Sequence, residues 1–357
     1  MGTPSAINNM DYSGDYKPSF HRFYDLMKFK VNTILLVSSL YDAFTLEEDG
    51  LLGAQISGRY SDLELSSPPQ IIRVSSGREA LGELERMHYD LVITMSHLID
   101  MDPFEFGRRA KEVQKGVPVV MLVTEAESLP AMQKRTAPGI DRVFYWSGDS
   151  ALLLAIVKHL EDVVNVDQDT RLGNVRVILV IEDSPRYYSI FLPIIYTEVV
   201  SQTQALIAEG LNENEKLLMK RARPKILLAG CFEEAMRIYE RYRDYILAVI
   251  TDVTFPCNGK EEEGAGFRFI TAIDRGVPVL LQSLHAEHGT MAKEMGIAFL
   301  DKNSETLLND LRGFFKEHLG FGDFVFRMPD GAEVGRAGDI REFIEVAQRV
   351  PADSLLY

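Results

Sequence analysis

The sequence predicts an α/β fold in which two tandem units each form a doubly wound, parallel, five-stranded sheet with helices on both faces. Short apolar runs recur along the chain, and they are continuous rather than alternating, as expected of strands buried on both faces. Helix-length segments separate these runs, which is typical of parallel sheets. The order of runs in the first half recurs in the second half, so the chain carries two copies of one unit.

The second unit contains four such runs. They predict strands at Val177–Ile181, Leu247–Ile250, Val277–Leu281 and Ile297–Leu300. Parallel strands have their carboxyl ends at one edge of the sheet, and ligands of open α/β sheets bind beyond that edge. Residues that directly follow these strands are therefore expected to converge, although they lie far apart in the sequence.

Five polar residues follow the four strands. They are Glu182, Asp183, Asp252, Ser283 and Lys302. Clustered carboxylates repel one another unless a cation joins them, and a set of oxygen ligands suits Mg²⁺. An Asp carboxylate in such a site can attack phosphorus and become an acyl phosphate. The alternative interpretation is that these are ordinary polar residues where loops begin, but five of them in this order favour a shared site.

On these residues the second unit resembles the receiver domain of bacterial response regulators, a flavodoxin-like fold. The resemblance implies that Asp252 is the phosphoacceptor and that Ser283 and Lys302 bind its phosphoryl oxygens. It also implies a Mg²⁺ site made by Glu182, Asp183, Asp252 and the main-chain carbonyl of Thr254. The chain departs from the family pattern in its Glu-Asp pair, where Asp-Asp is commoner, and at Leu284 and Asn303.

The first unit repeats the pattern without its chemistry. Ile34–Val37 and Val92–Thr94 match strands of the second unit, but Ser38 and Ser39 replace the acidic pair. Met95 replaces the nucleophile, and the Lys position falls on Trp146 or Ser147. This unit resembles a receiver that cannot form an aspartyl phosphate, and we call it a pseudo-receiver.

We divide the chain into four parts on this basis. They are an N-terminal extension (1–30), a pseudo-receiver domain (31–166), a receiver domain with an extended first helix (174–319) and a tail (320–357). The stretch 49–69 contains Gly, Ser and Pro and is expected to be a loop. The polar stretch 167–174 is short for a flexible linker, so the two units can pack against each other.

The first helix of the second unit is expected to be unusually long. Residues 187–223 contain helix formers and many apolar positions, which predicts a helix of roughly 20 to 35 residues. Such a helix suits dimer or domain contacts. The alternative is a helix that folds back over its own domain.

Two polar motifs near the site receive structural interpretations. The run Glu261–Glu263 is expected to begin the third helix, where negative charge favours the helix dipole. His285 and His288 have helical spacing, but no third metal ligand is evident, so we interpret them as an exposed helix start.

Composition excludes several classes of protein. The chain has 357 residues and a net charge of −15, which argues against nucleic-acid binding. No apolar run is long enough to span a membrane, so we expect no membrane partner. The only cysteines, Cys231 and Cys257, form no disulfide framework and fit a reducing cytosol, so the protein is expected to be cytoplasmic.

Two functional hypotheses remain. The first is a phospho-accepting module of two-component signalling, or of a phosphorelay, served by a sensor histidine kinase or a phosphotransfer protein. The second is a phosphorylation-independent scaffold for homodimerisation or docking. Neither is an enzyme beyond self-phosphorylation from a donor and slow self-dephosphorylation.

The tail gives a further resemblance. Residues 321–326 are expected to form a strand, 327–331 a turn and 340–348 a short helix. The tandem order and the stretch 299–304 resemble the N-terminal regulatory region of bacterial phosphoenolpyruvate synthase-like, pyruvate-binding proteins. This resemblance implies a C-terminal output domain outside these residues.

Overall fold

The computed structural model confirms the predicted fold class. It describes residues 26–39, 52–63, 65, 67–134, 139–173, 175–205, 223–318, 324–327 and 333–337. Within these ranges the chain forms two parallel five-stranded sheets, ordered β2-β1-β3-β4-β5 and β12-β11-β8-β6-β7. In both sheets the second strand along the chain lies at one edge, beside the first, and the remaining strands follow on the other side. This is the flavodoxin-like order.

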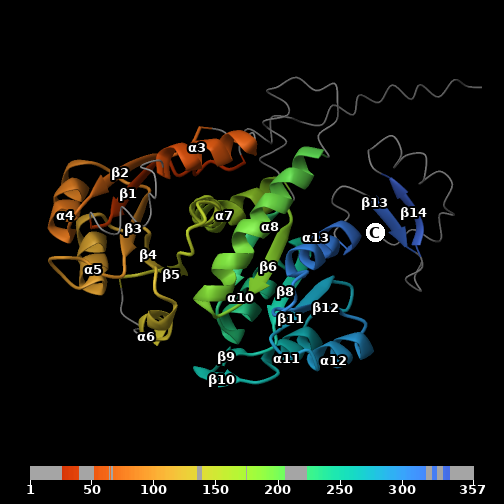
Figure 1. The fold of residues 1–357 in the computed structure, drawn as a ribbon. Helices are drawn as coiled ribbons and strands as arrows, with labels where there is room; N and C mark the ends of the chain where they lie inside the picture. The colour runs from red at the N-terminus through yellow and green to blue at the C-terminus, as the bar shows by residue number, and fades with distance from the viewer. Residues whose placement is uncertain are drawn as a thin grey trace, which may run out of the picture.

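The first sheet carries helices on both faces (Figure 1). Its strands are β1 (Thr33–Val37), β2 (Gln70–Val74), β3 (Leu91–Met95), β4 (Val119–Val123) and β5 (Arg142–Tyr145). One face is covered by α3 (Leu52–Asp62) and α7 (Ala151–Gly173). The opposite face is covered by α4 (Gly77–Arg86), α5 (Pro103–Val113) and α6 (Leu129–Lys134), which follows a 3₁₀ turn, η1 (Ala126–Ser128).

The second sheet has the same layers. Its strands are β6 (Val177–Ile181), β7 (Lys225–Ala229), β8 (Ile246–Asp252), β11 (Val279–Ser283) and β12 (Ala298–Asp301). Each of the four predicted strands overlaps one of these, and β7 was not predicted. One face is covered by α8 (Pro185–Ala205) and α13 (Leu307–His318). The other is covered by α10 (Phe232–Tyr242), α11 (Ala265–Ala272) and α12 (His288–Glu294), with a 3₁₀ turn, η2 (Arg243–Tyr245), after α10.

The prediction of a loop at 49–69 is wrong for part of that stretch, because α3 lies within it. Ile56, Tyr60 and Leu63 are spaced by about one turn and are buried in the core under the helix. Burial of this stripe outweighs the low helix propensity of Gly53 and Gly58. Local composition therefore gave the wrong answer where a tertiary contact decides.

The prediction that Glu261–Glu263 begins a helix is also wrong. A hairpin of β9 (Phe255–Cys257) and β10 (Lys260–Glu262) occupies this stretch. Asn258 and Gly259 form its turn with positive φ angles of 51° and 74°, a conformation that Asn-Gly favours. The helix α11 begins only after Gly264.

Helix α7 runs through the predicted boundary between the units. Residues 167–173, expected to connect the units, are helical, and residue 174 lies outside the described residues. One hydrophobic cluster extends from Ile34 and Ile93 of the first sheet, through Leu154 of α7, to Ile178 and Ile250 of the second sheet. Figure 1 shows α7 and α8 between the two sheets. The two units therefore share a core.

The extended first helix is observed as α8 over 21 residues, and residues 206–222 lie outside the described part. It does not only cover its own sheet. The amide of Tyr145 in β5 donates to the Ser189 hydroxyl at 2.9 Å, and the Tyr188 hydroxyl donates to the Val143 carbonyl. The described part of α8 therefore covers its own sheet and also contacts β5 of the first sheet.

Polar side chains of α7 bind the backbone that precedes β1. The Met27 amide donates to Asp169 at 3.0 Å, and the Phe29 amide donates to Asn165 at 2.9 Å. The end of the predicted N-terminal extension is thus held on α7, and residues 1–25 lie outside the described part.

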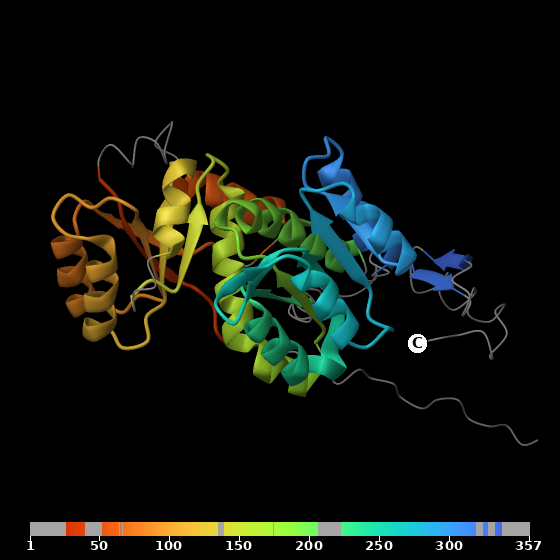
Figure 2. The same cartoon turned by 90° about the horizontal axis from the view of Figure 1, so that it is seen from below.

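In the tail, β13 (Phe324–Arg327) overlaps the predicted strand and pairs with β14 (Glu333–Ala337). Both views place this hairpin beyond α13, away from the first sheet (Figure 2). The helix predicted at 340–348 lies outside the described residues.

A buried ionic network joins α7 to the edge strand β7. Arg223 donates to both carboxylate oxygens of Asp162 at 2.7 and 2.9 Å, and Lys225 lies 2.8 Å from Asp169. The Tyr196 hydroxyl of α8 donates to the same Asp162 carboxylate at 3.0 Å. Asp162, Asp169 and Lys225 have no exposed side-chain surface, and Arg223 has 3%. These charges pair with one another away from water, although the Lys225 ammonium forms ion pairs without a hydrogen bond of good geometry among the described residues.

The first prediction concerns this network. Arg223→Ala should lower the free energy of unfolding by about 3–5 kcal/mol, because it leaves a buried carboxylate without its main partner. Arg86→Ala is the matched control, since Arg86 pairs with Glu83 on the surface at 76% side-chain exposure and should cost less than about 1 kcal/mol. Chemical denaturation measures both values. Equal costs for the two variants would contradict the role assigned to the network.

Candidate functional site

Three carboxylates meet at the carboxyl edge of the second sheet. Glu182 and Asp183 follow β6, and Asp252 ends the neighbouring strand β8. One oxygen atom of each lies within 4.8 Å of the others. The two strands are parallel and adjacent, so their ends deliver these residues to one place. The convergence expected from the sequence is present.

Lys302 supplies the positive charge of the site. Its Nζ lies 2.6 Å from Glu182 Oε2 and 2.8 Å from Asp252 Oδ2, and its side chain is 1% exposed. The ring of Tyr187 lies 4.3 Å from the same nitrogen and adds a cation–π contact. Burial alone would lower the pKa of Lys302, but the two carboxylates outweigh it and raise that pKa. Lys302 is therefore a charged ammonium that bridges two acids.

The acids outnumber this one cation. Burial raises the pKa of Glu182, and the charge on Asp252 adds to the increase, although Lys302 opposes it. Burial and Asp252 raise the pKa of Asp183 from 3.8 to about 6. Negative charge at the site is thus incompletely compensated, and an additional cation would relieve it.

Ser283 ends β11, which is the neighbour of β8 in the sheet, and Thr254 lies two residues after Asp252. The Ser283 hydroxyl is buried at the end of β11; it accepts from the His285 amide at 3.1 Å and pairs with His288 Nδ1 at 2.8 Å. Thr254 lies in the short turn between β8 and β9. The predicted histidine pair at 285 and 288 thus includes a residue that contacts the site.

Sequence reasoning missed three residues at the site. Gln282 is fully buried and donates to Glu182 Oε2 at 3.1 Å, while its own Oε1 has no partner among the described residues. Tyr187 covers Lys302. Gly266 lies so close to the Asp252 carbonyl that a Cβ there would be 2.1 Å from its oxygen. A polar residue inside an apolar strand was the available signal for Gln282.

At the corresponding edge of the first sheet, the positions that match the three acids hold Ser38, Ser39 and Met95. Met95 and Trp146 are buried in the shared core, and Ser38 is fully buried. Over the described ranges, the only cluster of at least three potential metal-ligating side chains is the one at Glu182, Asp183 and Asp252. Within the described ranges, the first sheet therefore has no carboxylate cluster that corresponds to the one in the second sheet.

The donor set at the second site fits a hard divalent cation. All three side chains offer carboxylate oxygens, which Mg²⁺ prefers. Glu182 is occupied by Lys302, Gln282 and the Ser184 amide, so Asp183 and Asp252 are the better direct ligands. Asp183 and Asp252 are both partly exposed, which leaves access for metal-bound water.

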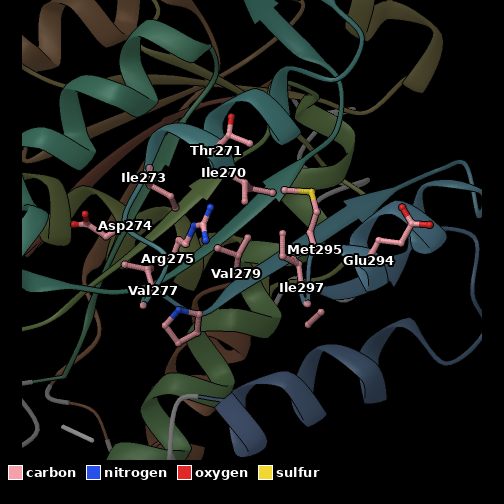
Figure 3. A pocket seen from close by; sticks show the side chains of 14 residues that line it. Ile270, Thr271, Ile273, Asp274, Arg275, Val277, Val279, Glu294, Met295 and Ile297 are labelled. Atoms are coloured by element: carbon pink, nitrogen blue, oxygen red, sulfur yellow. The ribbon is translucent and has the colours of Figure 1, made fainter. Parts of the chain in front are cut away.

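A hollow of about 740 Å³ lies at the opposite edge of the second sheet (Figure 3). It is lined by the amino end of β11, the end of α11 and the start of β12, with Arg275 and Glu294 among mainly apolar side chains. None of the five predicted site residues lines it. The carboxylate site and this hollow therefore lie at opposite edges of the second sheet and share no residue.

Comparison with known proteins gives structural likenesses only. No family model and no curated protein matches the chain. A chemotaxis response regulator of Vibrio cholerae is 20% identical with a TM-score of 0.29 and matches over 37% of this chain and 99% of its own. The receiver domain of a sensor histidine kinase of Pseudomonas aeruginosa, with magnesium in its active-site cleft, is 21% identical with a TM-score of 0.28 over 37% and 98%.

A probable two-component response regulator/GGDEF domain protein matches over 81% of this chain and 98% of its own, at 16% identity and a TM-score of 0.33. Likenesses at this level carry no argument about function, and the fold class rests on the sheet topology. None of the helices in the described ranges has the length and apolar character needed to cross a membrane.

The second prediction follows from the raised pKa of Asp183. The folded state binds this proton more tightly than the unfolded state, so the stability it contributes is present below pH 4 and is lost as the pH rises through about 6. Without metal, the free energy of unfolding should fall across this window by on the order of 1–2 kcal/mol more in wild type than in Asp183→Asn. Mg²⁺ at pH 7 should restore stability to the wild type only.

Denaturant titrations at several pH values, with and without Mg²⁺, measure these differences. Glu294→Gln, at the opposite edge of the sheet, is the control and should behave as wild type. Identical pH curves for wild type and Asp183→Asn would contradict the assignment.

Proposed function

We propose that the second unit is a phospho-accepting receiver of a two-component signalling system and that Asp252 is its phosphoacceptor. The observation that carries this proposal is the bridge of Lys302 between Glu182 and Asp252, beside a third carboxylate. A structural ion pair needs one acid for each base. Three acids around one buried base instead suit a site that takes up a cation and a phosphoryl group.

The chain's own residues perform most of the reaction. The Asp252 side chain is 14% exposed and its Oδ2 lies 2.8 Å from Lys302 Nζ. A carboxylate oxygen of Asp252 can attack the phosphorus of an acyl phosphate or phosphohistidine donor, with the donor's oxygen or nitrogen as the leaving group. Lys302 stays charged and stabilises the negative oxygens of the transferred group. Mg²⁺, held by Asp183, Asp252 and the carbonyl of Thr254, would neutralise charge on the same oxygens.

The partners follow from this chemistry. The donor in the cell is proposed to be a sensor histidine kinase or a phosphotransfer protein. The first unit, as a pseudo-receiver, is proposed to respond to the second unit rather than to accept phosphate, because Met95 stands where Asp252 stands in the second unit. The readout is proposed to be a partner protein or a further C-terminal domain.

The alternative, a scaffold that works without phosphorylation, rests on the shared core. The cluster that passes through α7 and α8 holds both units together whether or not Asp252 is modified. It does not explain why a buried ammonium is surrounded by excess acids. We therefore favour the receiver.

The same geometry suggests how the first unit responds. Helix α8 begins two residues after Asp183, and its first turns carry Tyr187 over Lys302 and Tyr188 against Val143 of β5. Arg142 of β5 also lies over the Tyr188 ring and 3.8 Å from Glu234. A displacement of Lys302 is thus transmitted to β5 through two neighbouring tyrosines.

The third prediction tests the phosphoacceptor. A small acyl phosphate with Mg²⁺ should add one phosphoryl group to the wild-type chain, and Asp252→Asn should abolish this, because an amide supplies no nucleophilic oxygen. Mass spectrometry of the intact chain measures the modification. Asp301→Asn is the matched control at the end of β12 and should be modified as wild type. Full modification of Asp252→Asn would favour the scaffold.

The fourth prediction tests transmission. Beryllofluoride, a phosphoryl mimic, should change hydrogen exchange between His285 and His318 and in β5. Tyr188→Phe removes the hydroxyl that binds Val143 and should reduce the response of β5 while leaving that of α12 and β12. Tyr187→Phe keeps the ring over Lys302 and serves as the control. An unchanged β5 in wild type, with Asp252 occupied, would exclude this route.

A further inference from the structure

His288 contacts the hydroxyl that is proposed to bind phosphate. Its Nδ1 lies 2.8 Å from Ser283 Oγ, at the first residue of α12. The imidazole packs edge-on against Phe267 of α11, with ring centroids 6.0 Å apart, and against His285 at 5.6 Å. These contacts fix the ring so that one nitrogen faces the hydroxyl.

The number of protons on this pair is limited. Ser283 has one hydroxyl proton, and its oxygen already accepts from the His285 amide at 3.1 Å. The contact with His288 therefore has two forms. Either Ser283 donates to an unprotonated Nδ1, or a protonated Nδ1 donates to Ser283.

Resting on the proposed receiver function, we propose that His288 is the positioning residue of Ser283 and that it exchanges roles with the hydroxyl when Asp252 is phosphorylated. Once Ser283 donates its only proton to a phosphoryl oxygen, the contact with His288 persists only if Nδ1 carries a proton and donates. Phosphorylation thus selects the Nδ1–H form of His288. The group responsible lies on α12, so the change is felt at the start of that helix.

Substitutions can separate the packing of the imidazole ring from the hydrogen bond of its Nδ1 atom. His288→Phe keeps an aromatic ring against Phe267 and removes the nitrogen. His288→Asn removes the ring and retains an amide near the Nδ1 position that can donate or accept. If the nitrogen matters, the Asn variant restores what the Phe variant loses; if packing matters, the order is reversed.

The probe is beryllofluoride with Mg²⁺ on the full chain, with occupancy of Asp252 measured by fluorine NMR. We expect His288→Phe to weaken beryllofluoride binding about three- to tenfold, the effect of one hydrogen bond, and His288→Asn to bind within about twofold of wild type. His285→Ala keeps the amide that binds Ser283 and is the control. In a Ser283→Ala background, His288→Phe should have no further effect, because the partner is already absent.

Nitrogen NMR of the imidazole gives the decisive readout. On saturation with beryllofluoride, His288 Nδ1 should change from partly to fully protonated, while His285 does not respond. Occupancy of Asp252 without any change at His288 Nδ1, or wild-type binding by His288→Phe, would overturn this role and leave the receiver function standing. Failure of beryllofluoride to bind the wild-type chain would instead overturn the receiver function and this role with it.

Discussion

The arrangement of the two units depends on the ion pair and hydrogen bonds of the buried Asp162 carboxylate. It lies on α7, accepts from Arg223 and the Ile226 amide at the edge strand β7, and accepts from Tyr196 of α8. A charge in this position is tolerated only when its partners are in place, so it specifies one packing of α7 rather than adding much net stability. With α7 fixed, the apolar faces of both sheets close on one core.

Because the two units share a core, the first sheet lies close to the helix that begins at the carboxylate site. Helix α8 begins beside the acidic pair and packs against both units, so Tyr187, which covers Lys302, is the direct neighbour of Tyr188, which meets β5. In a unit with an isolated core, a change at Lys302 would remain inside that unit. Here the first sheet is part of the surroundings of the site, although its own strand ends carry Met95 and Trp146 rather than acids.

The distribution of charge at the site depends on the length of the Glu182 side chain. Glu182 is one methylene longer than Asp, and its carboxylate is buried against Lys302 and Gln282. Its two oxygens are occupied by these donors and the Ser184 amide. This leaves Asp183 and Asp252 as the accessible acids, and the pKa of Asp183 is raised by burial and by the charge on Asp252. A cation site and a phosphoryl site can then coexist at one strand end.

The sequence by itself determined the fold class and the placement of Glu182, Asp183, Asp252, Ser283 and Lys302 at the carboxyl edge of one sheet, because continuous apolar runs define buried parallel strands and such strands end at one edge. It did not determine α3, whose helix depends on burial of Ile56 and Tyr60, or the hairpin before α11. Only the tertiary structure decided that α7 belongs to both units and that Gln282 and His288 contact the site. Pairing of Asp162 with Arg223 or of Ser283 with His288 is set by distances across the fold, and no local pattern of residues encodes those distances.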